Sequence, residues 1–164
     1  MVKEMSKFKI NKVTLYAANL IAVQLVFALA DMYEITLEQV FETFTKLNYW
    51  KVLNDTEICC ILAHDGIKDT VSDVSKQFDT ILGTQLNAYK KMVIPFDSQS
   101  ITIIEYLMKE EKLSRQDAMT LWFSSKTYKE IIRRKLTYIS AMRGYWELNL
   151  ELEKNPKWMT EDFE

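Results

Sequence analysis

VTLYAANLIAVQLVFALA, residues 13–30, is the stretch that decides the fold. It carries no charge over its whole length and lies between Lys12 and Asp31. A helix built from it is apolar nearly all round, and such a helix has to be enclosed by lipid or by protein. The identity of that enclosure determines the class of the protein.

Three interpretations of this segment compete. A membrane span needs about 20 apolar residues, and Asn19 and Gln24 interrupt the run. A secretion signal would explain the preceding lysines and the small residues Ala28-Leu29-Ala30, but the same two amides interrupt its apolar region. A core helix needs apolar residues at helical spacing, and these are present at Leu15, Ala18, Ala22, Leu25, Val26 and Leu29. We favour the core helix.

An internal repeat supports this choice. An offset of 78 residues aligns 23–74 with 101–152 without a gap. Both copies show an apolar helix, a hydroxyl cap (Thr36 and Ser114), an amphipathic helix, an aromatic break and a third helix. The second copy of the apolar segment contains Glu105 and Lys109, as a soluble amphipathic helix does. Identical pairs are Leu29/Leu107, Lys51/Lys129, Ile61/Ile139, Ala63/Ala141 and Gly66/Gly144.

The composition predicts an all-α fold. Hydrophobic residues make up 48% of the 164 residues, with only three Gly and two Pro, which favours long helices over many short strands. We expect a helical bundle of two tandem, related three-helix units with a connecting helix. The net charge of −2 argues against nucleic acid as the default partner. The adjacent pair Cys59-Cys60 cannot bridge itself easily, which suggests a reducing, cytoplasmic compartment.

The pattern divides the chain into five parts. We expect a flexible basic lead at 1–12, a first helical unit plus connector helix at 13–91, a linker at 92–100, a second helical unit at 101–156 and an acidic-aromatic tail at 157–164. Expected helices include 13–33, 50–63, 69–91, 127–138 and 145–153. Gly66 and Gly144 mark breaks, and Gly83 marks a kink within 69–91.

No residue pattern specifies catalysis. His64-Asp65 could act in acid–base chemistry, but it sits where a helix stop is expected. Cys59 and Cys60 could be nucleophiles or ligands, yet zinc sites need paired Cys/His spacing, and buried thiols fit better. The sequence lacks a glycine-rich phosphate loop and a Gly-x-Ser-x-Gly elbow. We therefore predict no catalytic, cofactor or metal residues; an enzyme using carboxylate or His64 chemistry is the second alternative.

Two features suggest binding. The densest basic cluster is Lys129, Arg133, Arg134, Lys135 and, further on, Arg143. It could contact phosphates, meet an acidic protein surface or form a solvated face, so a nucleic-acid-binding regulator using 129–135 is the first alternative. Trp158 and Phe163 lie among acidic residues and could anchor a partner, or Trp158 could fold back onto its own core. The predicted partner-binding residues are Trp158, Phe163, Arg133, Arg134 and Arg143.

A resemblance to known domains also suggests a binding role. The stretch LSRQDAMTLWFSSKTYKEI (113–131), followed by RGYWELNLELEKNP (143–156), resembles small helical domains of unknown function from Gram-positive bacteria and their mobile elements. The stretch ITLEQVFETFTKLNYWKVL (35–53), followed by LAHDG (62–66), is loosely similar to a related domain that often neighbours genes of the ADP-ribosyltransferase type. Domains of this family usually carry a histidine-bearing segment after the third helix. This chain lacks that segment, unless His64 stands in for it. The resemblance implies an antitoxin-like or accessory role.

These observations together predict a non-enzymatic intracellular module. It would bind and occlude a protein partner, as an antitoxin or a phage-encoded inhibitor does. We expect no membrane association.

Overall fold

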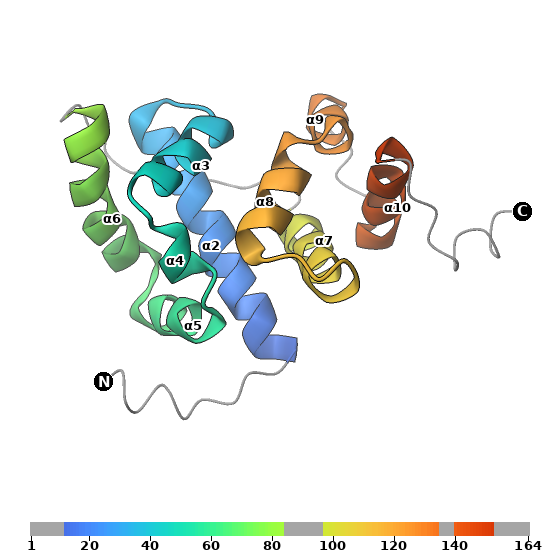
Figure 1. The fold of residues 1–164 in the computed structure, drawn as a ribbon, viewed down its shortest axis with the longest axis horizontal. Coiled ribbons are helices and arrows are strands. Elements are labelled where there is room, and N and C mark those ends of the chain that lie inside the picture. The colour runs from blue at the N-terminus through green and yellow to red at the C-terminus, as the bar shows by residue number, and fades with distance from the viewer. Residues whose placement is uncertain (1–11, 84–96, 135–139, 153–164) are drawn as a thin grey trace, which may run out of the picture.

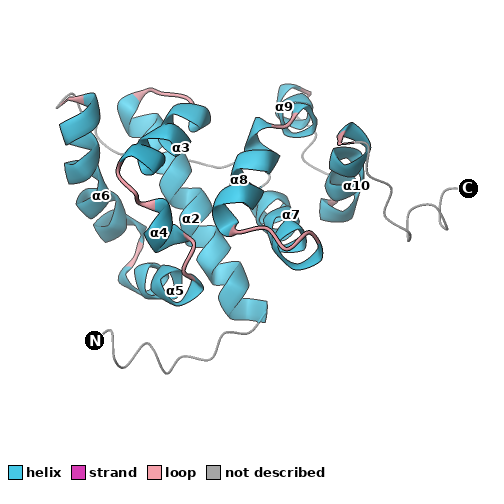
Figure 2. Ribbon diagram, viewed as in Figure 1, coloured by secondary structure: helices cyan, strands magenta, loops and turns pink. Residues whose placement is uncertain are grey.

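The computed structural model describes residues 12–83, 97–134 and 140–152. These residues form nine α-helices and contain no strand (Figure 1, Figure 2). The predicted all-α helical bundle is therefore confirmed.

The apolar segment forms the central helix, α2 (Lys12–Tyr33). Helices α3, α5, α6 and α7 all pack against it (Figure 1). Ala18, Ala22, Val23, Leu25, Val26 and Leu29 are each fully buried. The stretch Leu15–Tyr33 is long and apolar enough to cross a membrane, and 61% of its most apolar window is buried within the protein. Neighbouring helices thus supply most of the enclosure that this helix requires.

Four helices follow α2 in the first half, and all but α4 pack directly against it. They are α3 (Leu37–Lys46), α4 (Trp50–Leu53), α5 (Thr56–Asp65) and α6 (Ile67–Leu82). At the start of α3, the Thr36 hydroxyl accepts from the amide of Gln39, and the Gln39 side chain accepts from the amide of Thr36. This capping box satisfies two of the amides that a helix start leaves unpaired. Phe44 then packs edge-to-face on Trp50 and Phe78 within the core.

Two of the expected boundaries in this half are wrong. The helix expected at 50–63 is divided into α4 and α5 because the Asp55 side chain accepts from the amide of Ile58 and starts a new helix. The helix expected at 69–91 begins at Ile67 and ends at Leu82. Gly83 has φ of 89°, a value that glycine adopts without strain, so it ends α6 and does not merely kink it.

The second half contains α7 (Asp97–Glu110), α8 (Arg115–Ser124), α9 (Lys126–Arg133) and α10 (Ala141–Glu151). Helix α7 starts inside the expected linker 92–100. The expected break at Gly144 is wrong, because Gly144 lies within α10. A Cβ atom there would lie 2.7 Å from Cδ1 of Ile103, so this glycine allows α10 to approach α7 closely and serves packing instead of a turn.

The two halves correspond locally. Helices α3 and α8 have the same length at the 78-residue offset, and both begin with a hydroxyl that accepts from the third residue on. The turns before them each contain a left-handed residue, Glu34 (φ 53°) and Lys112 (φ 59°). After α8 the correspondence loosens. Helix α4, moved by 78 residues, falls within α9, but α10, moved back by the same number, spans the break between α5 and α6. That the two halves are tandem copies stays a prediction.

Buried contacts join the halves into one hydrophobic core. Phe123 of α8 packs edge-to-face on Phe27 of α2, with ring centroids 5.6 Å apart, and also meets Phe41 of α3. Arg115, at the start of α8, is completely buried and reaches into the first half. Its Nε donates to Oδ1 of Asn19 at 2.6 Å and its Nη1 donates to the carbonyl of Leu53 at 2.7 Å.

Candidate protein-interaction site

Helices α9 and α10 lie side by side at the outer end of the second half (Figure 1). A groove of about 420 Å³ separates them. Its lining combines apolar side chains with charges of both signs, namely Lys126, Thr127, Glu130, Ile131, Arg134, Glu147, Leu150 and Glu151. The groove is thus a polar-rimmed hollow between two helices, open to solvent.

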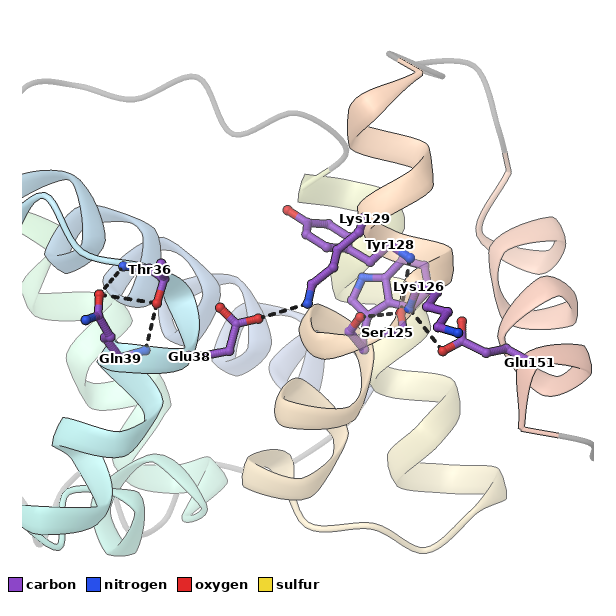
Figure 3. Close-up of polar contacts among 9 residues, drawn as sticks. Thr36, Glu38, Gln39, Ser125, Lys126, Tyr128, Lys129 and Glu151 are labelled. Atoms are coloured by element: carbon purple, nitrogen blue, oxygen red, sulfur yellow. Dashed lines mark hydrogen bonds and ion pairs between the residues drawn. The ribbon is translucent and has the colours of Figure 1, made fainter.

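Glu151 fixes the geometry at one end of this groove. Its carboxylate accepts from the backbone amide of Lys126 at 3.0 Å (Figure 3). It also accepts from the backbone amide and from the hydroxyl of Thr127, each at 2.7 Å. Burial raises the pKa of Glu151, but these hydrogen bonds outweigh it and leave the pKa below the ordinary value. An ionised carboxylate from the last turn of α10 therefore caps the positive N-terminus of α9.

Replacing Glu151 by alanine is expected to lower the free energy of unfolding by about 1 kcal/mol at pH 7, as loss of a helix cap does. Because the folded pKa is lowered, this stabilisation is complete above the unfolded pKa near 4.5 and disappears as pH falls through the folded value. Urea unfolding at pH 7 and pH 3 measures the difference. Glu42→Ala, which removes only an exposed pair with Lys46, is the control. Equal losses for both variants at pH 7 would contradict a capping role.

An apolar stripe runs along the outer side of α10. Met142, Trp146 and Leu150 are spaced four residues apart, so they fall on one side of the helix. Met142 and Leu150 are each 47% exposed. Leu150 borders the α9–α10 groove, and Met142 borders a second hollow of about 250 Å³ that Tyr106, Glu110 and Tyr145 complete. We call the stripe and the α9–α10 groove together the α9–α10 face.

The structure places three of the predicted binding residues at this face. Arg134 ends α9 and lines the groove. Arg133 pairs with Glu130 at 2.7 Å, and Arg143 pairs with Glu147 at 3.0 Å while its guanidinium lies 4.0 Å from the centre of the Trp146 ring. Both glutamates line the groove, so the arginines belong to its rim. Trp158 and Phe163 lie outside the described residues.

The basic cluster has two further members, Lys129 and Lys135. Lys129 turns toward the first half and pairs with Glu38 of α3 at 3.4 Å (Figure 3). Lys135 lies outside the described residues. Since Lys129, Arg133 and Arg143 each contact a carboxylate, the surface of α9 and α10 carries mixed charge instead of a continuous basic patch.

The candidates for chemistry, Cys59, Cys60, His64 and Asp65, all lie on α5 and differ in burial. His64 and Asp65 are exposed at the end of α5, where the expected helix stop lies. Cys59 and Cys60 are buried thiols, as expected. Burial raises the pKa of Cys59 to about 11, so it is protonated at neutral pH and donates to the Leu53 carbonyl. Among the described residues, no group of three His, Cys, Asp or Glu side chains could hold a metal ion.

The carboxylates of the groove are engaged in structural contacts. A hydrogen bond from Arg133 lowers the pKa of Glu130, and Glu151 is ionised on the start of α9. Proton transfer near pH 7 needs a group whose pKa lies close to that pH. A lowered carboxyl pKa suits binding and positioning better than general acid or base catalysis.

Sequence reasoning did not single out Met142 or Leu150. Their spacing with Trp146 was visible in the sequence, but the expected break at Gly144 placed Met142 outside a helix. A continuous α10 is what brings the three onto one side.

Comparison of the chain with protein-family models, with curated proteins and with solved structures gives no match.

Proposed function

We propose that this protein is a non-enzymatic, cytoplasmic protein-binding module that occludes its partner through the α9–α10 face. The observation that carries the proposal is the apolar stripe of Met142, Trp146 and Leu150 between two hollows, in which Met142 and Leu150 are each 47% exposed. Interfaces with high affinity combine a central apolar or aromatic anchor with a polar rim. The rim here contains Arg134, Arg143 and Glu147.

The shape of the face favours an amphipathic helix as the partner's contact element. A helix lying along α10 would place residues four apart against the stripe, in the manner of helix-in-groove recognition. Rim charges of both signs can pair with acidic and basic residues on its flanks, which sets orientation more than affinity. The resemblance to domains found beside ADP-ribosyltransferase-like genes supports an antitoxin-like or accessory role for such binding.

We expect Leu150→Lys to weaken partner binding at least tenfold, because it places a charge in the apolar stripe; a tenfold loss corresponds to 1.4 kcal/mol. The matched control is Ile81→Lys, since Ile81 is 41% exposed on α6, outside this face. Affinity purification from the native host with wild type and both variants, read by quantitative mass spectrometry, identifies the partner. The affinity of the purified pair then gives the fold-change.

A genuine partner is retained by wild type and by Ile81→Lys and is lost with Leu150→Lys. A partner retained equally by all three proteins would bind elsewhere and would exclude this face. Retention of nucleic acid by the wild type, abolished by salt and by Arg133→Glu, would favour the nucleic-acid alternative.

A further inference from the structure

The hollow between α7 and α10 adjoins the α9–α10 face, because Met142 belongs to both. We call it the tyrosine hollow; it measures about 250 Å³ and is lined by Tyr106 and Glu110 of α7 and by Met142 and Tyr145 of α10. The two helices approach closely at Gly144, where a Cβ atom would meet the Ile103 side chain. This approach brings the two tyrosine rings together, with 5.4 Å between their centroids.

The two tyrosines give the hollow aromatic walls. Tyr145 is only 4% exposed and lies at the inner side, whereas Tyr106 is half-buried and Met142 is exposed. The face of an aromatic ring attracts a cation, and a methionine side chain adapts its shape to an apolar neighbour. Such walls suit an organic cation that offers a flat or apolar surface along with its charge.

The charge at the tyrosine hollow is negative. Glu110 is exposed, and none of the ion pairs among the described residues includes it. It is the last residue of α7, where the helix dipole already places negative charge. Glu111 follows and accepts a hydrogen bond from the Tyr145 hydroxyl at 3.3 Å. Burial, and after it the charge of Glu111, raises the pKa of Tyr145 to about 12, and Glu110 acts in the same direction.

The neighbouring basic side chains do not line this hollow. Lys109 donates to the carboxylate of Glu105 at 3.0 Å. Arg143 pairs with Glu147 at 3.0 Å. Lys112, in the turn after α7, is exposed. The negative charge at the hollow is therefore available to a cation that another molecule supplies.

Arginine has the chemistry that fits these walls. A planar guanidinium can stack on the ring of Tyr106 while two of its N–H groups donate to the carboxylate of Glu110. The ammonium of lysine is a compact and strongly hydrated charge, so it gains less from an aromatic wall. The hollow between α5 and α6 provides a contrast within the same protein, because its lining contains three aspartates and no aromatic ring: Leu62, Asp65, Asp69, Thr70, Ser72 and Asp73.

We propose that the tyrosine hollow binds an arginine side chain of the protein partner. The source of the arginine rests on the proposed function, whereas the preference of the hollow for a guanidinium does not. Leu150 follows Met142 by eight residues, which is about 12 Å along α10 at 1.5 Å per residue. A partner helix that lies along α10 would therefore carry its arginine about two helical turns from the apolar residue that meets Leu150.

The test titrates the full chain with N-acetyl-arginine amide at constant ionic strength and observes the methionine methyl groups by NMR. The chain has eight methionines, and Met142→Leu assigns the signal from the hollow. N-acetyl-citrulline amide is the control ligand, since it has nearly the shape of arginine without the charge. We expect a saturable shift of the Met142 signal with the arginine probe and none with the citrulline probe, up to about 0.1 M.

Three variants locate the binding. Glu110→Gln should weaken binding of the arginine probe at least tenfold, because it removes the ionised acceptor. Tyr106→Leu should weaken it about threefold, because the ring face is lost. Asp73→Asn removes a charge from the hollow between α5 and α6 and should leave the affinity unchanged. The signal of Met119, which is fully buried, reports whether each variant stays folded, and Glu110→Gln, at an exposed position, tests the site even if Tyr106→Leu disturbs the core.

The proposal is overturned if the arginine probe gives no saturable shift, or if the citrulline probe gives the same one. It is also overturned if Glu110→Gln binds the arginine probe as tightly as the wild type does. Tighter binding of N-acetyl-lysine amide or of tetramethylammonium would overturn the assignment to arginine, because the hollow would then select an ammonium group.

The outcomes for this hollow and for the proposed function are separable. If the arginine probe binds while no partner depends on Leu150, the hollow recognises arginine and the proposed function fails. If Leu150→Lys abolishes partner capture while the probe does not bind, the proposed function stands and this inference fails. If both hold, Glu110→Gln should weaken the partner complex at least tenfold, and replacing the partner's arginine should cause no further loss in that variant, because both changes remove one contact.

Discussion

Replacing Arg115 by alanine is expected to lower the free energy of unfolding by about 3–5 kcal/mol. The guanidinium is fully buried, and no carboxylate of the described residues forms an ion pair with it. It is held instead by neutral acceptors: Asn19 Oδ1, the Leu53 carbonyl and the Thr56 hydroxyl at 2.9 Å. Alanine removes the Arg115 donor from each of these groups, leaving the Leu53 carbonyl with the Cys59 thiol, and opens a cavity between the halves.

Urea denaturation of Arg115→Ala and of Arg133→Ala measures this effect. Arg133 is exposed and pairs only within its own helix, so its loss should stay within about 0.5 kcal/mol. Arg115→Met keeps most of the volume and removes the buried charge, and it should lose less than alanine does. Similar stability for Arg115→Ala and Arg133→Ala would show that the buried hydrogen bonds contribute nothing net.

Replacing Phe123 by alanine is expected to cost about 3–5 kcal/mol as well, which is the usual range for removing a buried phenylalanine. Phe123 is 1% exposed and touches Phe27 and Phe41 across the halves and Tyr128 within its own half. The cavity would therefore weaken the junction of the halves more than either half alone.

Thermal and urea unfolding, followed by circular dichroism and by tryptophan fluorescence, test this junction. Phe123→Leu is the matched variant and should lose clearly less, because it keeps an apolar side chain in the same place. If Phe123→Ala unfolds in one transition with wild-type stability, the aromatic contacts between α8 and the first half are not what joins the halves.

Local signals in the sequence predicted much of the fold. The hydroxyl caps at Thr36 and Ser114 and the uncharged run at 13–30 each specify a helix start or a buried helix on their own. Helices α2, α3 and α8 accordingly begin where the pattern places them, within a residue or so. Asp55 was also visible as a cap, but the apolar residues on both sides of it suggested one continuous helix.

The remaining features depend on contacts between distant residues. Gly144 looks like a helix stop, and only the approach of Ile103 shows why glycine stands inside α10. Arg115 falls on the same helical side as Ala118, Met119 and Trp122, a spacing that could have revealed its burial. Its acceptors, however, come from positions about 60 and 96 residues away, and no local pattern indicates them.

The central position of α2 has a consequence for synthesis. This helix is made before α7, which covers part of it and begins at Asp97. At about 5–20 residues per second, the roughly 60 residues between them take several seconds to translate. During that interval the nascent chain exposes the apolar side of α2 that α7 covers in the folded protein.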